Sequence, residues 1–310
     1  MSGIYLNRVQ RLVVAIAVFL VFALAGAAPA DKTPLRTVVD PTGRTVNVPR
    51  DPRRVVALAP SVTEIVYALG REDRLAGVTR FSNYPPAAGQ LPKVGSYVHL
   101  DVERIVALRP DLCVAVKDGN PIAVVEQLEA LGLPVFAVNP LDLETVMQSV
   151  EAIGGLLDAA AVARDVVADM RQRIARVEAR VAQTSLRPGV FLQIGISPIV
   201  SVGSSTFIHT LIEMAGGTNL AAGPTPYPRF SREQVIALAP EVIVISSMAR
   251  DAVFEQVKAE WMQWPVIPAV RRGAVFIAPP DLFDRPSPRL VDALEVLAGV
   301  IHPNLFEARP

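Results

Sequence analysis

The side chains that most often carry out enzyme chemistry are few in this chain and form no catalytic pattern. The three histidines, His99, His209 and His302, are scattered, and no HExxH motif or Cys/His spacing of a zinc site occurs. The segment Gly203-Ser-Ser lacks the nucleophile-elbow pattern, and no phosphate-binding G-x-x-x-x-G-K-[ST] loop is present. The sequence therefore predicts that the protein is not an enzyme and has no catalytic residue, metal site or cofactor.

Aromatic side chains in loops form a second group of candidate functional residues. Flat rings with polar groups at their edges suit the binding of a broad ligand. The candidates lie in segments expected to follow strands, and they are Phe81, Tyr84, Tyr97, Tyr227 and Phe283, with Asp281 and Arg285 beside the last. For each aromatic residue the alternative is core packing or loop anchoring. For Asp281 and Arg285 the alternative is an ion pair that fixes their own loop.

The first thirty residues have the pattern of a cleaved secretory signal peptide. Arg8 and Arg11 precede the uncharged run 12–28, and 25–27 and 28–30 both offer an A-x-A cleavage pattern. The run is at the short end for a membrane span, which needs about 20 residues. No cysteine stands at the cleavage site to carry a lipid. We expect a soluble periplasmic protein that acts as a monomer.

Composition restricts the partners. Thirty Lys and Arg balance thirty Asp and Glu, so net charge gives no reason to expect binding to nucleic acid. The only cysteine is Cys113, which excludes an internal disulfide. It lies in an apolar run, where a buried and unreactive thiol is expected.

Short apolar runs alternate with helical patterns in both halves of the chain, which predicts an α/β fold with parallel sheets. The expected strands are 55–58, 75–78, 111–116, 134–138, 190–194, 241–246 and 274–278. The expected helices are 63–69, 103–108, 124–131, 207–215, 233–238 and 290–300. Segment 101–116 also aligns with 231–246 without a gap, so that Glu103 matches Glu233 and Pro110 matches Pro240. This repeat predicts two similar lobes.

The segment between the repeat copies predicts one amphipathic helix over 158–181. Apolar residues recur at Val162, Val166, Met170, Ile174, Val177 and Val181, and no Pro or Gly interrupts them. A surface helix within one lobe is the alternative. We expect an N-terminal lobe (31–157), a connecting helix (158–183) and a C-terminal lobe (184–310), with the ligand cleft between the lobes. A helical connection of roughly 36 Å resists bending, so opening and closing should be small.

These features resemble the periplasmic binding proteins for vitamin B12, haem and iron siderophores, whose two lobes are joined by a single helix. The resemblance extends from Arg53 to the last helix, and it is carried by segments 59–65, 82–86, 103–112, 191–195, 230–235 and 284–289. Segments 82–86 and 191–195 are most similar to the vitamin B12-binding members. The resemblance implies a solute-binding component of an ABC importer that carries a corrinoid, cobalamin or cobinamide, as transported ligand.

The resemblance also implies roles for individual residues. The positions that match corrinoid contacts are Phe81, Tyr97, Tyr227, Asp281 and Arg285. Relatives often have tryptophan where Tyr97 and Tyr227 stand, and tyrosine where Phe81 stands, so the rim of the site differs here. Tyr84 and Phe283 complete the predicted ligand site.

Glu103 and Glu233 match a pair of glutamates, one on each lobe, that bind arginines of the membrane permease, the partner of the ATPase subunits. The alternative is that both are first-turn helix acids behind the caps Asp101 and Ser231, favoured by the helix dipole. The two roles are compatible.

Two other cargoes remain open for the same fold. A ferric siderophore would pair with arginines, and Arg80, Arg229 and Arg285 are available. Haem-binding members supply an axial tyrosine from the region of Tyr97, and His99 is close to it in the sequence. Tyr97 follows Gly95-Ser96 rather than the glycine directly, which argues against haem.

Overall fold

The computed structural model describes residues 34–246 and 253–306. The predicted signal peptide and its cleavage sites lie outside these ranges. The contacts discussed below lie within residues 36–310, which form one compact unit. In the described part of the chain, no helix is both long and apolar enough to span a membrane.

The N-terminal half of the chain, residues 36–157, contains a four-stranded parallel sheet in the order β4-β3-β5-β6. Its strands are β3 (Val55–Ala57), β4 (Leu75–Val78), β5 (Leu112–Val116) and β6 (Val135–Val138), and α2 (Pro60–Ala68), α3 (Val102–Ala107) and α4 (Ile122–Ala130) connect them. The strands are almost entirely buried, as their uninterrupted apolar sequences predicted. A separate hairpin, β1 (Leu35–Val39) and β2 (Thr45–Pro49), was not predicted.

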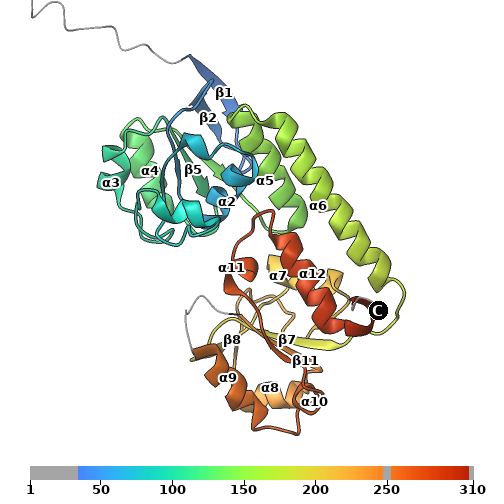
Figure 1. Cartoon of the computed structure of the whole chain (residues 1–310). Helices are drawn as coiled ribbons and strands as arrows, with labels where there is room; N and C mark the ends of the chain where they lie inside the picture. Colours follow the sequence, from blue (N-terminus) through green and yellow to red (C-terminus); the bar gives the residue numbers. More distant parts are fainter. Residues whose placement is uncertain (1–33, 247–252, 307–310) are drawn as a thin grey trace, which may run out of the picture. The chain divides into compact units, whose positions relative to one another are not determined.

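The C-terminal half, residues 184–306, has a second parallel sheet in the order β12-β11-β7-β9 (Figure 1). The strands are β7 (Gly189–Gln193), β9 (Thr218–Asn219), β11 (Val242–Ile245) and β12 (Val275–Ile277), and β8 (Ile199–Val200) pairs with β10 (Arg229–Phe230). The helices are α7 (Phe207–Met214), α8 (Arg232–Leu238), α9 (Val253–Met262), α10 (Pro268–Arg271), α11 (Pro280–Phe283), α12 (Leu290–Ile301) and α13 (Pro303–Phe306). The predicted strands and helices are all present, with ends shifted by up to three residues.

The internal repeat extends to backbone conformation. Arg109 and Ala239 occupy matching positions directly before a proline, and their φ angles are +47° and +48°. A non-glycine residue seldom adopts this left-handed conformation. Ile105 and Val235 also match, and both are fully buried on the inner face of α3 and α8. The two copies therefore share a helix ending as well as a sequence pattern.

Two consecutive helices follow the first sheet, α5 (Leu143–Leu156) and α6 (Ala160–Val181). Helix α6 packs along α5 and then against α12 (Figure 1). It begins two residues later than predicted because Asp158 has a φ of +53°, outside the right-handed helical region. Its buried stripe also starts differently, since Ala163 is buried whereas Val162 is exposed.

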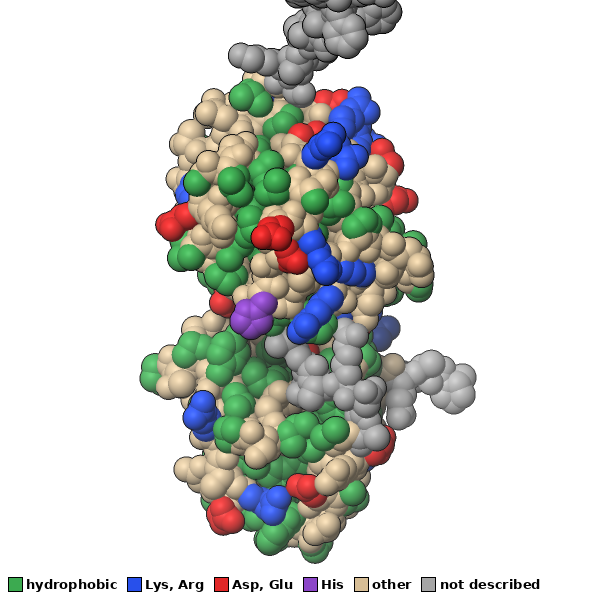
Figure 2. Space-filling model, turned by 90° about the vertical axis from the view of Figure 1, so that its left-hand side faces the viewer, with side chains coloured by type: hydrophobic (Ala, Val, Ile, Leu, Met, Phe, Trp, Pro, Cys, Tyr) green, Lys and Arg blue, Asp and Glu red, His purple; other side chains and the backbone are tan. Residues whose placement is uncertain are grey.

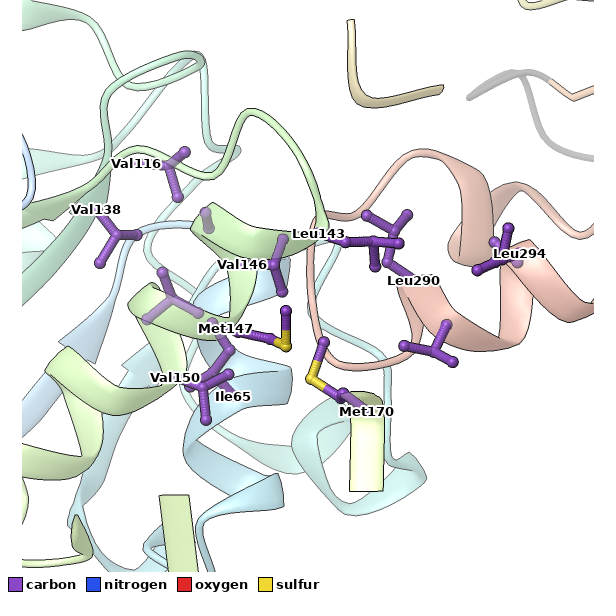
Figure 3. Packing of buried hydrophobic residues seen from close by; sticks show 14 of the residues in the cluster. Ile65, Val116, Val138, Leu143, Val146, Met147, Val150, Met170, Leu290 and Leu294 are labelled. Atoms are coloured by element: carbon purple, nitrogen blue, oxygen red, sulfur yellow. The ribbon is translucent and has the colours of Figure 1, made fainter. Parts of the chain in front are cut away.

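One hydrophobic cluster runs through both halves of the chain and includes residues of α2, α5, α6, α7 and α12. Figure 3 shows Leu143 of α5 facing Leu290 of α12, and Met147 lying near Met170 of α6. Arg173 of α6 reinforces this packing, because it pairs with Asp292 and Glu295 of α12. Helix α6 is therefore packed along its length against elements from both halves.

Candidate functional site

The loop that carries Phe81 is held by buried hydroxyl groups. Thr63 Oγ1 donates to Ser82 Oγ at 2.9 Å, and Thr79 Oγ1 lies 3.0 Å from the same oxygen. All three residues are buried, so these hydrogen bonds are not exchanged with water. Phe81 itself is only partly buried, and its ring and that of Tyr97 form an edge-type pair with centroids 6.3 Å apart.

Tyr97 is positioned by a buried amide. Asn120 Nδ2 donates to the carbonyl oxygens of Tyr97, at 2.8 Å, and Leu58, at 2.9 Å. Its Oδ1 accepts from the backbone N–H of Val116. The amide thus joins the ends of β3 and β5 to the Tyr97 loop. These hydrogen bonds fix the backbone that carries the partly buried Tyr97 ring.

Tyr227 lies in a loop fixed by backbone hydrogen bonds on either side. Gly203 N–H donates to Pro226 at 2.8 Å, and Ser201 N–H donates to Pro228 at 3.0 Å. A Cβ on Gly203 would overlap the carbonyl oxygen of Thr225, so the two segments approach as closely as a glycine allows. The Tyr227 ring is half exposed, which leaves a face for a ligand.

The pKa values of Tyr97 and Tyr227 are affected by acidic groups from both halves of the chain. Burial raises the pKa of Tyr227, and the negative charges of Asp118, Tyr97 and Asp284 raise it further. Burial, Asp284 and Asp118 likewise raise the pKa of Tyr97. Asp118 and Asp284 are therefore close enough to both phenols to raise their pKa values. Phe81 and Tyr97 form a ring pair, and Tyr97 is near enough to Tyr227 to affect its pKa. Both phenols stay protonated at neutral pH.

Arg285 is buried in a network that links α2 to the segment before α12. Its guanidinium donates to Glu64 Oε1 at 2.8 Å, to Asp281 Oδ1 at 2.6 Å and to the carbonyl oxygen of Phe81 at 3.0 Å. Ser287 Oγ donates to the other oxygen of Glu64 at 2.6 Å. The alternative interpretation of Asp281 and Arg285 as a local ion pair is thus confirmed. Arg285 stabilises the loop and exposes little surface to a ligand.

Two further predicted contacts differ in their surroundings. Phe283 is fully buried in the main hydrophobic cluster, so its ring has no face for a ligand, and core packing explains its presence. Tyr84 is exposed, but the Arg289 guanidinium lies 3.6 Å from the centroid of its ring. Asn83 donates to Asp281 at 3.1 Å, which ties the same two segments together.

Three polar residues of the site were missed by the sequence analysis: Glu64, Asn120 and Asp284. Glu64 and Asp284 lie inside segments that carry the family resemblance, but nothing in either segment indicates a partner. The Oδ2 atom of Asp284 is buried and has no hydrogen-bond partner in the described part of the chain. Burial and the nearby charge of Asp281 raise its pKa to about 7, although Arg285 lowers it.

Glu103 and Glu233 lie in the first turns of α3 and α8. Asp101 accepts from the N–H of Arg104 as the cap of α3, and Ser231 accepts from that of Gln234 as the cap of α8. Both glutamates are exposed, and neither pairs with a basic side chain in the ranges that the structure covers. Hydrogen bonds from the backbone and Ser231 lower the pKa of Glu233, which keeps its carboxylate ionised.

His209, His302 and Cys113 have structural surroundings. His302 Nε2 contacts the carbonyl oxygen of Gly216, and His209 Nδ1 contacts Asn219. Cys113 is buried, which raises the pKa of its thiol to about 12. Among the described residues, no group of three His, Cys, Asp or Glu could hold a metal. The face in Figure 2 mixes acidic, basic and apolar side chains and is hollowed near its middle, beside a histidine.

The chain belongs to the periplasmic binding protein family, which it matches over residues 55–282. It is 35% identical to a vitamin B12-binding protein of Photorhabdus laumondii over 255 residues, which are 82% of this chain and 89% of that protein. It is 34% identical to a vitamin B12-binding protein of Vibrio parahaemolyticus over 245 residues, with 78% of this chain and 86% of that protein covered. The family consists of binding proteins rather than enzymes, as predicted.

Solved structures confirm the fold class. The periplasmic vitamin B12 binding protein of Vibrio cholerae superimposes with a TM-score of 0.73 at 29% identity, covering 83% of this chain and 99% of that one. A periplasmic haem-binding protein of Pseudomonas aeruginosa gives a TM-score of 0.75 at 31% identity, covering 84% of this chain and 95% of that one. The same fold therefore accommodates more than one tetrapyrrole.

Proposed function

We propose that this protein is the periplasmic solute-binding component of an ABC importer and that its cargo is a corrinoid, cobalamin or cobinamide. The observation that carries the proposal is the meeting of Phe81 and Tyr97 from one half of the chain with Tyr227 from the other. Aromatic rings from two halves of the chain suit a broad disc, which would bury far more area than a small solute. Similarity to vitamin B12-binding proteins supports the same cargo.

The two halves correspond in this proposal to an N-terminal lobe (31–157) and a C-terminal lobe (184–310), joined by a connecting helix (158–183). Helix α6 lies within residues 158–183 and packs against elements of both halves. The buried pair of Glu64 and Arg285 also joins them. These contacts support a cleft that opens and closes by small movements.

Haem is the second candidate, favoured by the similarity to the haem-binding protein of Pseudomonas aeruginosa. Tyr97 would be the axial ligand, and a tyrosine binds ferric iron as phenolate. Burial, Asp284 and Asp118 all raise the pKa of Tyr97, so this environment opposes phenolate formation. The two propionates of haem would also meet acidic neighbours. The charges around Tyr97 therefore favour a neutral, amide-edged corrin.

Spectroscopic titration of the mature protein with cyanocobalamin, cobinamide, haemin and a ferric siderophore tests the choice of cargo. We expect saturable binding of the corrinoids with a dissociation constant in the nanomolar to micromolar range, about −8 to −12 kcal/mol. Y97A and Y227A should each weaken it by about tenfold, since an aromatic contact contributes about 0.5–1.5 kcal/mol beyond area burial. A Soret shift with haemin and no corrinoid binding would overturn the proposal.

We further propose that Glu103 and Glu233 contact the permease that works with the ATPase subunits. Each is exposed in the same position of a repeated unit, so one docking motif would be presented twice. An exposed ion pair contributes only about 0–1 kcal/mol, so these contacts would orient the complex rather than hold it. The protein would act as a monomer.

Charge reversal tests the docking proposal. E103R/E233R should abolish transport in cells while corrinoid affinity stays within about twofold of wild type. The matched control is E126R/E255R, which reverses one exposed glutamate in each half, on α4 and α9. Unchanged transport in the first variant, or equal loss in both, would remove the docking role.

A further inference from the structure

Arg80 lies beside the aromatic part of the candidate site. The carbon atom of its guanidinium is 4.6 Å from the centroid of the Phe81 ring, so the planar cation lies over that ring. Phe81 in turn forms the ring pair with Tyr97. The backbone N–H of Arg80 donates to the carbonyl oxygen of Gly95 at 2.7 Å, which joins its loop to the loop that carries Tyr97. Arg80 is therefore held next to two of the proposed ligand contacts.

The Arg80 guanidinium is accessible to a ligand. The residue is exposed, and no acidic side chain pairs with it within residues 34–246 and 253–306. Arg285, by contrast, is buried and already pairs with Glu64 and Asp281. A guanidinium carries its N–H donors in a planar fork that matches the oxygens of a phosphate or a carboxylate. Stacking on Phe81 uses the face of this fork, whereas the donors point along its edges.

The candidate site carries charges of both signs. Burial raises the pKa values of Tyr97 and Tyr227, and the negative charges beside them raise both values further. Those charges belong to Asp118 and Asp284. Arg80 adds a positive charge beside the aromatic pair. A ligand with a neutral rim and a single anionic group is therefore favoured with its anion at Arg80 rather than at either carboxylate.

We propose that Arg80 is a specificity-determining residue that binds the phosphodiester of a nucleotide-bearing corrinoid and thereby favours cobalamin over cobinamide. Cobinamide has the same corrin ring and ring amides but lacks the nucleotide and its phosphate. An arginine and a phosphate form two parallel charge-assisted hydrogen bonds, which a neutral side chain of the ligand does not offer. The inference rests on the proposed function, because it assumes that a corrin lies beside Phe81 and Tyr97.

The expected preference is modest because Arg80 is exposed. An exposed ion pair changes an equilibrium constant by up to about fivefold, and a bound corrin that covers part of the pair strengthens it. We therefore expect Arg80 to contribute about five- to tenfold in affinity. The preference should shrink to about twofold between about 0.05 M and about 0.5 M salt, because water and ions still reach the pair.

The experiment measures the dissociation constants of cyanocobalamin, cobinamide phosphate and cobinamide by titration of the mature protein. Cobinamide phosphate carries a phosphate but no nucleotide base, so it separates recognition of the phosphate from recognition of the base. Arg80→Gln keeps a planar polar group and removes the charge. The matched control is Arg50→Gln, an exposed arginine that precedes β3 and so lies at the amino-terminal edge of the first sheet, whereas Arg80 follows the carboxyl end of β4. A general disturbance of Phe81 in R80Q affects all three ligands alike and cancels in their ratio.

Wild type and R50Q should bind the two phosphate-bearing ligands about five- to tenfold more tightly than cobinamide, and R80Q should bind all three within about twofold. Equal binding of the three ligands by wild type, or a preference that survives R80Q or high salt unchanged, overturns the role of Arg80 and leaves the proposed function standing. A preference for cyanocobalamin alone also overturns it, since the base rather than the phosphate is then recognised. Absence of binding of all three corrinoids sinks the proposed function and this inference with it.

Discussion

Glu64 provides the sharpest test of how the two halves are held together. Its carboxylate is about 2% exposed and pairs with Arg285, about 6% exposed, at 2.8 Å. It also accepts from Ser287 at 2.6 Å, and Arg289 lies 3.4 Å away. Glu64 belongs to α2, whereas its three partners precede or begin α12. Glu64→Ala therefore removes the acceptor from a buried guanidinium that comes from the other half of the chain.

Removal of one partner from a buried ion pair costs about 3–5 kcal/mol, because the remaining charge stays desolvated. Asp281 still contacts Arg285 in the variant, so we expect the lower end, about 3 kcal/mol. Glu64→Gln loses the charge but keeps an oxygen that can accept from Arg285. A hydrogen bond to a charged group contributes about 1.5–3 kcal/mol. E64Q should therefore lower the free energy of unfolding less than E64A does. Replacement of Glu64 and Arg285 together by methionine should cost less than E64A, because neither charge of the pair stays desolvated.

Urea unfolding of the mature protein at pH 7 measures these differences, with a constant m-value as the condition for comparing them. The matched control is Glu260→Ala, which breaks the exposed pair of Arg232 and Glu260 at 3.1 Å and should cost less than about 1 kcal/mol. If E64A were within about 0.5 kcal/mol of wild type, or indistinguishable from E260A, the inference that this buried pair stabilises the junction would be refuted.

Three other predictions follow from single residues. Because the folded-state pKa of Asp284 is about 7 and the unfolded value is about 3.9, the native state retains a proton that the unfolded state has lost. Unfolding free energy should therefore fall as pH rises from about 4 to about 7, and D284N should flatten this slope in thermal scans. Gly203→Ala should destabilise by about 1–3 kcal/mol and weaken ligand binding by displacing the Tyr227 loop, whereas Gly223→Ala, which has open space around its Cβ, should do neither. Cys113, with a thiol pKa of about 12, should not react with an aromatic disulfide reagent at pH 8 until urea unfolds the protein.

The sheets were predictable because their strands are buried on both faces and appear as uninterrupted apolar runs. Helix α5 was not predicted, and Gly154 near its end explains why. Glycine disfavours a helix interior, yet a Cβ at this position would lie only 2.5 Å from the Cβ of Ala163 in α6. The glycine allows α5 and α6 to pack closely. Helix propensity is a local property of the sequence, so it does not predict a contact between two helices.

The partial exposure of Phe81, Tyr97 and Tyr227 was predictable because each ring sits on a loop after a strand. The same pattern did not distinguish Phe283, because a loop sequence does not tell which side chain turns inward. Glu64 and Arg285 are 221 residues apart in the chain, so their contact depends on tertiary structure alone. The raised pKa of Asp284 likewise comes from burial, which the sequence does not give.

Two of the segments that carry the resemblance in the sequence analysis contact each other. Segment 59–65 supplies Glu64, and segment 284–289 supplies Arg285, Ser287 and Arg289, so these two segments form a junction. Tyr97 and Tyr227 depend on other supports, namely Asn120 and the backbone of 201–203. Substitutions of these rings can therefore alter the proposed ligand surface without disturbing the Glu64 network.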